Sequence, residues 1–254
     1  MYAFLHRLLS DKEDGQVFSC FGFWHFFYII LALVLISGAV YFLRNKGEST
    51  KEKVLKTFIG IAFGLYMADF FLMPFAYGKI DIDKLPFHSC TSMSIMCFLS
   101  NHSNFLKKYR LNFALLGAIS NLMYICYPAG IVGYAPISYR AIQTLLFHTM
   151  MFVYGFTTVI VEREKLDIKR SYRDVVILII LTLWAIIGNT LYSGSADGYS
   201  HNFNWFFIKT DPFGGVLPEN IAPYLLPVVN LIAFFGIEII VYLIFIAIRK
   251  KKYS

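Results

Sequence analysis

Charged residues are scarce in this sequence. They make up 15% of its 254 residues, whereas a soluble globular domain carries about 25%. Hydrophobic residues make up 57% of the chain. The shortage of charge excludes an ordinary soluble domain, and the repeated apolar runs of about 20 residues indicate membrane spans. The expected fold class is an all-α, polytopic membrane helix bundle that forms a single transmembrane domain over residues 1–254.

Cysteine and the familiar catalytic motifs are also scarce. The four cysteines, Cys20, Cys90, Cys97 and Cys126, form no C-x-x-C pair and no zinc-ligand spacing, so we expect neither a metal nor a cofactor. The sequence has no Gly-x-Ser-x-Gly elbow, no His-Glu-x-x-His motif and no glycine-rich phosphate loop. A disulfide between Cys90 and Cys126 or Cys20 stays open, because an outward-facing compartment permits one.

The excess of basic residues does not indicate a nucleic-acid partner. The net charge is +7, but the basic residues cluster between the apolar runs and not along one soluble face. Residues 1–15 lack the long apolar core of a signal peptide. The helical spacing of Phe4, Leu5, Leu8 and Leu9 predicts a short interfacial helix instead.

The apolar runs predict seven transmembrane helices, of which the fourth is the shortest and the seventh the longest. The predicted spans are 21–43, 56–77, 86–105, 111–129, 139–161, 173–193 and 222–248. Of the 23 Lys and Arg residues, 17 fall in one alternating set of connections and at the C-terminus. The positive-inside rule places this set in the cytoplasm and the N-terminus outside. We therefore expect a multi-pass protein of the bacterial plasma membrane.

The longest connection, the outer loop 194–221, combines aromatic residues with a Pro/Gly stretch. We expect an aromatic cluster of this loop to lie in the membrane interface; the loop contains His201, Phe203, Trp205, Phe206 and Phe207. The alternative is a cap or a re-entrant segment over the outer mouth. Residues 211–215 read Asp-Pro-Phe-Gly-Gly, which predicts a turn.

Few ionisable residues fall well inside the predicted spans. They are His25, Asp69, His88, His148 and Glu238. Such residues either hydrogen-bond neighbouring helices or mark a functional site. With the predicted topology, Glu238 alone lies in the inner half. In the outer half, one depth is shared by five polar residues, which are Asp69, His88, Cys90, His148 and Asn189. Their common depth favours a functional cavity near the outer surface.

Within that level, Cys90 and His148 are the candidate reactive pair. Pro86 suits the first turn of a helix, which would place His88 and Cys90 about 200° apart on that helix. The base for a Cys90 nucleophile would then come from another helix, and His148 fits on depth. An imidazole that takes the proton activates a thiol that is otherwise inert in an apolar site. His88 would bind a phosphate or orient a partner. The alternative is that Cys90 is a small buried hydrophobic residue.

The stretch Leu85-Pro86-Phe87-His88-Ser89-Cys90 resembles the Leu-Pro-x-His-x-Cys signature of the YwaF-like integral membrane family. Phe147-His148, Gly188-Asn189 and the stretch 204–212 are also similar, although the family's Lys-Pro reads Lys-Thr-Asp-Pro here. Eukaryotic relatives of that family include an acyltransferase that makes polyunsaturated ether phospholipids. The resemblance implies a Cys90 nucleophile with His148 as its partner.

The favoured hypothesis is therefore an integral membrane acyltransferase that takes an acyl group from an ester of a membrane phospholipid or lipoprotein and passes it to a lyso-lipid or another acceptor. Cys90 and His148 would be catalytic, and His88, Asp69 and Asn189 would bind substrate or support the site. The alternative is a transporter or binding protein that holds a small solute in the outer cavity. A structural or sensory partner protein is a third hypothesis, which the absence of a signalling domain disfavours. The sequence does not indicate an oligomeric state.

Overall fold

The computed structural model describes residues 17–77, 82–192, 194–196, 199–201, 203–211 and 216–253. The predicted interfacial helix over residues 4–9 and most of the predicted turn at 211–215 lie outside these ranges. The chain divides into two compact units. The first unit comprises Met1–Lys84 and Met93–Arg163, and the second comprises Leu85–Ser92 and Glu164–Ser254.

The described residues are largely helical, as the sequence predicts. The α-helices are α2 (Phe23–Leu43), α3 (Glu48–Tyr77), α4 (Ser89–His102), α5 (Arg110–Cys126), α6 (Tyr139–Val161), α7 (Tyr172–Leu191) and α8 (Ala222–Tyr253). The 3₁₀ turns are η1 (Ile82–Lys84), η2 (Lys107–Tyr109), η3 (Ala129–Ile131), η4 (Arg163–Lys165), η5 (Ile168–Arg170) and η6 (Trp205–Phe207). Strands β1 (Gly194–Ala196) and β2 (Tyr199–His201) form a short antiparallel hairpin with Ser195 opposite Ser200.

Five helical segments among the described residues are long and apolar enough to cross a membrane. They are Phe23–Leu43, Glu48–Leu72, Tyr139–Val161, Ile168–Leu191 and Ala222–Ile248. The predicted third and fourth spans correspond to α4, with 14 residues, and α5, with 17. At 1.5 Å per residue both are shorter than the roughly 30 Å hydrocarbon core. The shortest of the seven is thus α4 and not the predicted fourth span, whereas α8 is the longest, as predicted.

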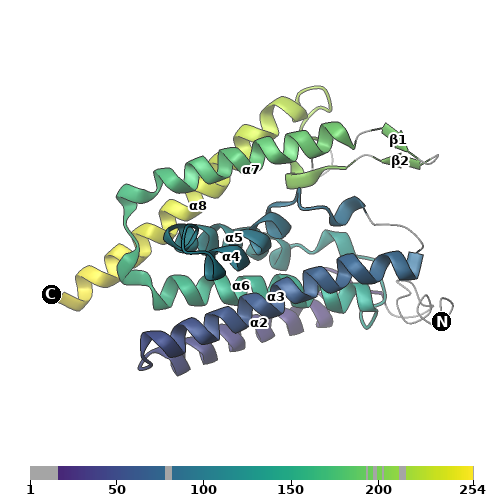
Figure 1. Ribbon diagram of the computed structural model, residues 1–254. Helices are drawn as coiled ribbons and strands as arrows, with labels where there is room; N and C mark the ends of the chain where they lie inside the picture. The colour runs from purple at the N-terminus through teal and green to yellow at the C-terminus, as the bar shows by residue number, and fades with distance from the viewer. Residues whose placement is uncertain are drawn as a thin grey trace. The chain divides into compact units, whose positions relative to one another are not determined.

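The first unit is built around α6. Helices α2 and α3 run beside α6 (Figure 1), and α5 packs closely against it. In the apolar window of α6, 72% of residues are buried, compared with 22% for α2. Gly155 permits the approach of α5, because a Cβ at this position would lie 2.5 Å from the Ala114 carbonyl oxygen. The centre of this unit is therefore α6, and α2 presents most of its apolar side chains outward.

One of the ionisable residues inside the predicted spans has a structural partner in this unit. The His25 ring is buried, and its Nε2 lies 2.6 Å from the Ile125 carbonyl oxygen. Its Nδ1 accepts a hydrogen bond from the Phe21 N–H at 2.8 Å. His25 therefore joins the beginning of α2 to the end of α5.

In the second unit, α7 and α8 lie side by side (Figure 1). The connection between them includes the β-hairpin and η6, and η6 contacts both helices. Trp205 and Phe206 of η6 are 0% and 2% exposed. These two rings are therefore covered by the second unit itself, and the position of the aromatic cluster at the level of the membrane interface stays a prediction. Phe207 is the exposed member of the three.

Candidate functional site

The signature segment 85–90 forms a turn followed by the beginning of α4. Helix α4 begins at Ser89 and not at Pro86, so the prediction that Pro86 opens the helix is wrong. The Pro86 carbonyl accepts hydrogen bonds from Ser92 Oγ at 2.6 Å and from Trp184 Nε1 at 2.7 Å. These bonds hold Pro86 in the turn. Because His88 lies before the helix, the 200° separation from Cys90 expected on one helix does not apply.

Phe87 fixes this turn within the second unit. Its ring centroid lies 4.8 Å from those of both Trp184 and Trp205. Helix α7 makes room for it through Gly188, where a Cβ would lie 2.4 Å from Phe87 Cγ. The Gly188 position therefore has a packing role that only the absence of a side chain permits.

Cys90 lies in the first turn of α4 and is partly exposed. It is a thiol, as are Cys20, Cys97 and Cys126, so the disulfides considered from the sequence are not present in the structure. The beginning of a helix carries a partial positive charge. Cys97, by contrast, is fully buried, and its Sγ–H donates to the Phe113 carbonyl at 3.3 Å.

His88 faces η6 in the same unit. Its Nδ1 accepts a long hydrogen bond of 3.5 Å from the Phe206 N–H, and its ring lies 6.0 Å from that of Phe207. An Nδ1 that accepts must be unprotonated, so in a neutral ring the proton is on Nε2. His88 therefore has an N–H donor at Nε2.

The backbone of η6 is strained and is held by asparagines. Phe206 and Phe207 have φ values of 61° and 52°, a region that costs a non-glycine residue about 1–2 kcal/mol. Asn189 pairs with the backbone of Trp205: its Nδ2 donates to the Trp205 carbonyl at 3.0 Å and its Oδ1 accepts from the Trp205 N–H at 2.9 Å. Asn230 Nδ2 donates to the Phe206 carbonyl at 2.8 Å. These bonds maintain the conformation that faces His88.

Asn189 was predicted to support the candidate site, and that role stays a prediction. Its amide is used by the Trp205 backbone, whose N–H contacts it directly. Trp205 is followed by Phe206, whose N–H contacts His88, so Asn189 is linked to His88 through η6. Asn204 closes the following turn, where its Oδ1 accepts from the Lys209 and Thr210 N–H groups at 2.8 and 3.1 Å.

His148 lies in the middle of α6, in the first unit, and is 4% exposed. Its Nδ1 lies 2.7 Å from Asn121 Oδ1 on α5, and its ring stacks on Tyr124 with centroids 3.7 Å apart. The Asn121 Nδ2 donates to the Gly117 carbonyl at 2.7 Å. A carbonyl only accepts, so this bond fixes the orientation of the amide and presents Oδ1 to His148. His148 Nδ1 must then carry the proton, which makes Nε2 the basic nitrogen of the neutral ring.

Asn121 is a member of the site that the sequence did not reveal. It is fully buried and lies on a different helix from His148. An asparagine within an apolar run is a signal of an interhelical hydrogen bond. It does not identify the partner, because that depends on how α5 and α6 pack.

Asp69 is paired with a lysine and not with either site histidine. Lys84 Nζ lies 2.7 Å from Asp69 Oδ2, and the Asp69 side chain is 1% exposed. Tyr66 donates its hydroxyl to the Lys84 carbonyl at 2.9 Å, which holds η1 beside α3. The buried pair thus fastens the end of α3 to the segment that precedes the signature.

The five predicted site residues are distributed between the two units. The structure brings His88, Cys90 and Asn189 into the second unit, with η6 linking His88 to Asn189. Asp69 and His148 belong to the first unit. A common cavity formed by all five stays a prediction. Among the described ranges, no group of three or more His, Cys, Asp or Glu side chains is arranged to hold a metal ion.

The helices that can cross a membrane and the polar groups buried among them define a multi-pass membrane protein. A family model matches residues 20–249, and the chain belongs to the TMEM164 family, a family of membrane proteins. No curated protein and no solved structure gives a significant match to the chain.

Proposed function

We propose that this protein is an integral membrane acyltransferase that uses Cys90 as nucleophile and His148 as base. The observation that carries the proposal is the hydrogen bond between His148 and Asn121, whose amide orientation is fixed by Gly117. A Cys-His-Asn arrangement recurs in unrelated cysteine enzymes, where the amide orients the imidazole. The Tyr124 ring stacks on the face of the His148 ring and so restricts its rotation.

The tautomer of His148 suits proton abstraction. With the proton on Nδ1 and directed at Asn121, the lone pair on Nε2 accepts a proton from an acid. The imidazolium that forms has its Nδ1–H donated to an amide oxygen, which favours the charged form. The ring is 4% exposed, so these interactions act in surroundings of low dielectric constant, where they are stronger than in water.

The proposed reaction has two steps. In the first, His148 removes the Cys90 proton while the sulfur attacks the ester carbonyl of a membrane phospholipid; the lyso-lipid oxygen leaves and takes the proton from His148. In the second, His148 removes the proton of an acceptor hydroxyl, whose oxygen attacks the thioester and releases Cys90 as a thiol. N–H groups at the beginning of α4 stabilise the oxyanion. No metal or cofactor takes part.

The remaining predicted residues have supporting roles in this proposal. His88, with its proton on Nε2, donates to a phosphate or ester oxygen of the substrate. Asn189 maintains the η6 conformation against which His88 rests. Asp69 and Lys84 fix the chain that leads into the signature. The site is assigned to the outer leaflet of a bacterial plasma membrane, with an outside N-terminus and a cytoplasmic C-terminus, on the strength of the charge asymmetry.

The test is capture of the thioester. Purified protein incubated with a phospholipid that carries a labelled acyl chain should gain the acyl mass on the peptide that contains Cys90, and neutral hydroxylamine should release it. Cys90→Ser should form little adduct, and any oxygen ester formed should resist neutral hydroxylamine. Cys126→Ala is the matched control, because that cysteine is exposed, and it should retain the adduct.

Full turnover by Cys90→Ala with a verified lipid substrate would eliminate the covalent mechanism. The alternative function, binding or transport of a small solute, would then account for the buried polar residues without an acyl-enzyme. An adduct confined to Cys20 or Cys126 would equally contradict the assignment of Cys90.

A further inference from the structure

Helix α8 carries a carboxyl group whose surroundings the proposed acyl transfer does not explain. Glu238 is 0% exposed. Neither Oε1 nor Oε2 has a hydrogen-bond partner among the residues that the structure describes. An ionised carboxylate is rarely buried without a cation or donors to satisfy it, because the loss of hydration costs several kcal/mol. The state of this group therefore needs a physical explanation.

The neighbours of Glu238 add to the problem. Asp174, near the beginning of α7, is also 0% exposed and interacts electrostatically with Glu238. Tyr242 lies four residues after Glu238, on the same face of α8, and donates its hydroxyl to Asp174 Oδ2 at 2.9 Å. Asp167, before η5, is a further acidic group within electrostatic reach of Tyr242. The groups known to act on Glu238 and Tyr242, namely Asp174 and Asp167, are therefore acidic.

We propose that Glu238 is a proton-binding site, a buried carboxylic acid that carries its proton while Asp174 is ionised. Two carboxylates in one apolar site do not both ionise readily, because each disfavours the charge of the other. The hydrogen bonds decide which one keeps the proton. Asp174 accepts from Tyr242, which stabilises its negative charge, whereas Glu238 has no donor among the described residues.

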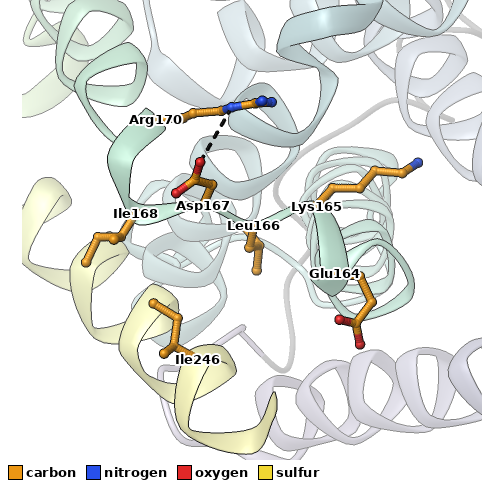
Figure 2. Close-up of a pocket in the computed structure, with 7 residues that line it drawn as sticks. All are labelled: Glu164, Lys165, Leu166, Asp167, Ile168, Arg170 and Ile246. Atoms are coloured by element: carbon orange, nitrogen blue, oxygen red, sulfur yellow. Dashed lines mark ion pairs between the residues drawn. The ribbon is translucent and has the colours of Figure 1, made fainter. Parts of the chain in front are cut away.

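A pocket lies about 12 Å along α8 from Glu238, at 1.5 Å per residue, and in this proposal it is the entrance for the proton. It has a volume of about 590 Å³ and is lined by Glu164, Lys165, Leu166, Asp167, Ile168, Arg170 and Ile246 (Figure 2). Ile246 follows Tyr242 by four residues, as Tyr242 follows Glu238, so the three side chains lie along one face of α8. The pocket, Tyr242 and the acid pair therefore succeed one another along the α7–α8 contact.

The site is independent of the proposed acyl transfer, because neither Cys90 nor His148 takes part in it. Its consequence is a pH-dependent contact between α7 and α8. When Glu238 loses its proton, two negative charges face each other across the contact, and their repulsion weakens the packing of the two helices. Raising the pH therefore removes the stability that the neutral acid provides.

Dicyclohexylcarbodiimide tests the protonation of Glu238 in the full-length protein. A protonated carboxyl adds to this reagent: the carboxyl oxygen bonds to the central carbon, its proton passes to a nitrogen, and rearrangement gives a stable N-acylurea. We expect the adduct mass on the peptide that contains Glu238 at neutral pH and a progressive loss of labelling as the pH is raised. Glu238→Gln should abolish it. Asp174→Asn removes the repelling charge, so labelling should decline at a lower pH than in the unaltered protein.

Glu162 is the matched control. It is a buried glutamate like Glu238, but it is ion-paired with Arg110 and should not react. Infrared difference spectra of the unaltered protein minus Glu238→Gln give a readout that does not depend on reagent access. They should contain the carbonyl band of a protonated carboxyl, and Ile246→Trp, which narrows the pocket, should slow the shift of that band in heavy water.

Three results would overturn the proposal. The first is the absence of the carbonyl band at neutral pH. The second is labelling of Glu238 that does not change with pH. The third is competitive protection of Glu238 by added Na⁺, which would identify a metal cation as the ligand. Failure of the acyl transfer leaves all three measurements unaffected, because they require no lipid substrate.

Discussion

The two units hold their histidines in different ways. In the first unit, His148 lies between two regular helices and is held by the side chains of Asn121 and Tyr124. In the second, His88 lies in a turn and faces the backbone of a strained segment, Phe206–Phe207, at 3.5 Å. One contact is short and built from side chains, whereas the other is long and depends on a loop.

Under the proposed function, the two rings serve different chemistry. His148 carries its proton on Nδ1 and presents Nε2 as a base, whereas His88 accepts at Nδ1 and presents Nε2 as a donor. A base has to be aligned with a single proton, which a rigid pair of helices provides. A donor to a lipid oxygen has to follow a substrate that varies in position, which suits a loop.

Replacing each histidine separately should give the largest effect on adduct formation, and the effect should differ between the two units. We expect His148→Ala to slow formation of the Cys90 adduct by about 10²–10⁴-fold, the usual contribution of a general base. His88→Ala should mainly raise the apparent KM for the lipid. Stopped-flow measurement of adduct formation against lipid concentration separates the two effects. Equal losses of rate with unchanged KM would remove the distinction between base and donor.

The interaction that fixes the tautomer of His148 can be removed while the imidazole ring is kept. Asn121→Leu keeps a similar volume but takes away the acceptor for Nδ1–H, so we expect a loss of about 10–100-fold in adduct formation, as for other residues that orient a reactive ligand. Asn121→Asp restores an acceptor and should recover part of the rate. NMR of ¹⁵N-labelled histidine should report the proton on Nδ1 in the unaltered protein. A proton on Nε2 would contradict the proposed base.

Two glycines extend the comparison to packing, with a smaller expected effect. Gly155→Ala and Gly188→Ala should each lower stability by about 1–3 kcal/mol, the usual effect of overpacking, despite the better helix propensity of alanine. At Gly155 the obstacle is the Ala114 carbonyl, whereas at Gly188 it is the Phe87 side chain. Adding Phe87→Ala should therefore relieve the clash at Gly188. Thermal unfolding in detergent measures the stability of both variants. An unchanged stability of Gly155→Ala would indicate that α5 and α6 adjust freely.

The sequence predicted the long apolar helices better than the local structure of the signature segment 85–90. Helix α6 spans Tyr139–Val161, as predicted from residues 139–161, and α2 and α7 agree to within two residues. Long apolar runs mark such helices because lipid or a protein core surrounds them on most sides. The beginning of α4 was misplaced, because Pro86 is held in a turn by Ser92 and Trp184, and the latter lies 98 residues further along the chain.

The residues that orient the histidines were beyond sequence analysis for the same reason. His148 was predicted from its place in an apolar run, but Asn121 gains its role only from the packing of α5 on α6. Trp205 and Phe206 have the composition of an interfacial cluster, which does not reveal the hydrogen bonds from Asn189 and Asn230 that hold them within the second unit. Glu238 was predicted as an isolated inner residue, and its neighbour Asp174 became evident from the contact between α7 and α8.

The burial of α5 has a consequence for how the protein is made. Arg110, Asn112, Ser120 and Asn121 are among its buried residues, and α6 packs along it. A helix of 17 residues is short for a membrane span, and its buried polar side chains disfavour insertion without a partner. Helix α5 is synthesised before α6, the helix that covers it in the folded protein. We therefore expect α5 to insert stably only together with α6, and a chain that ends after Cys126 to retain α5 poorly in the bilayer.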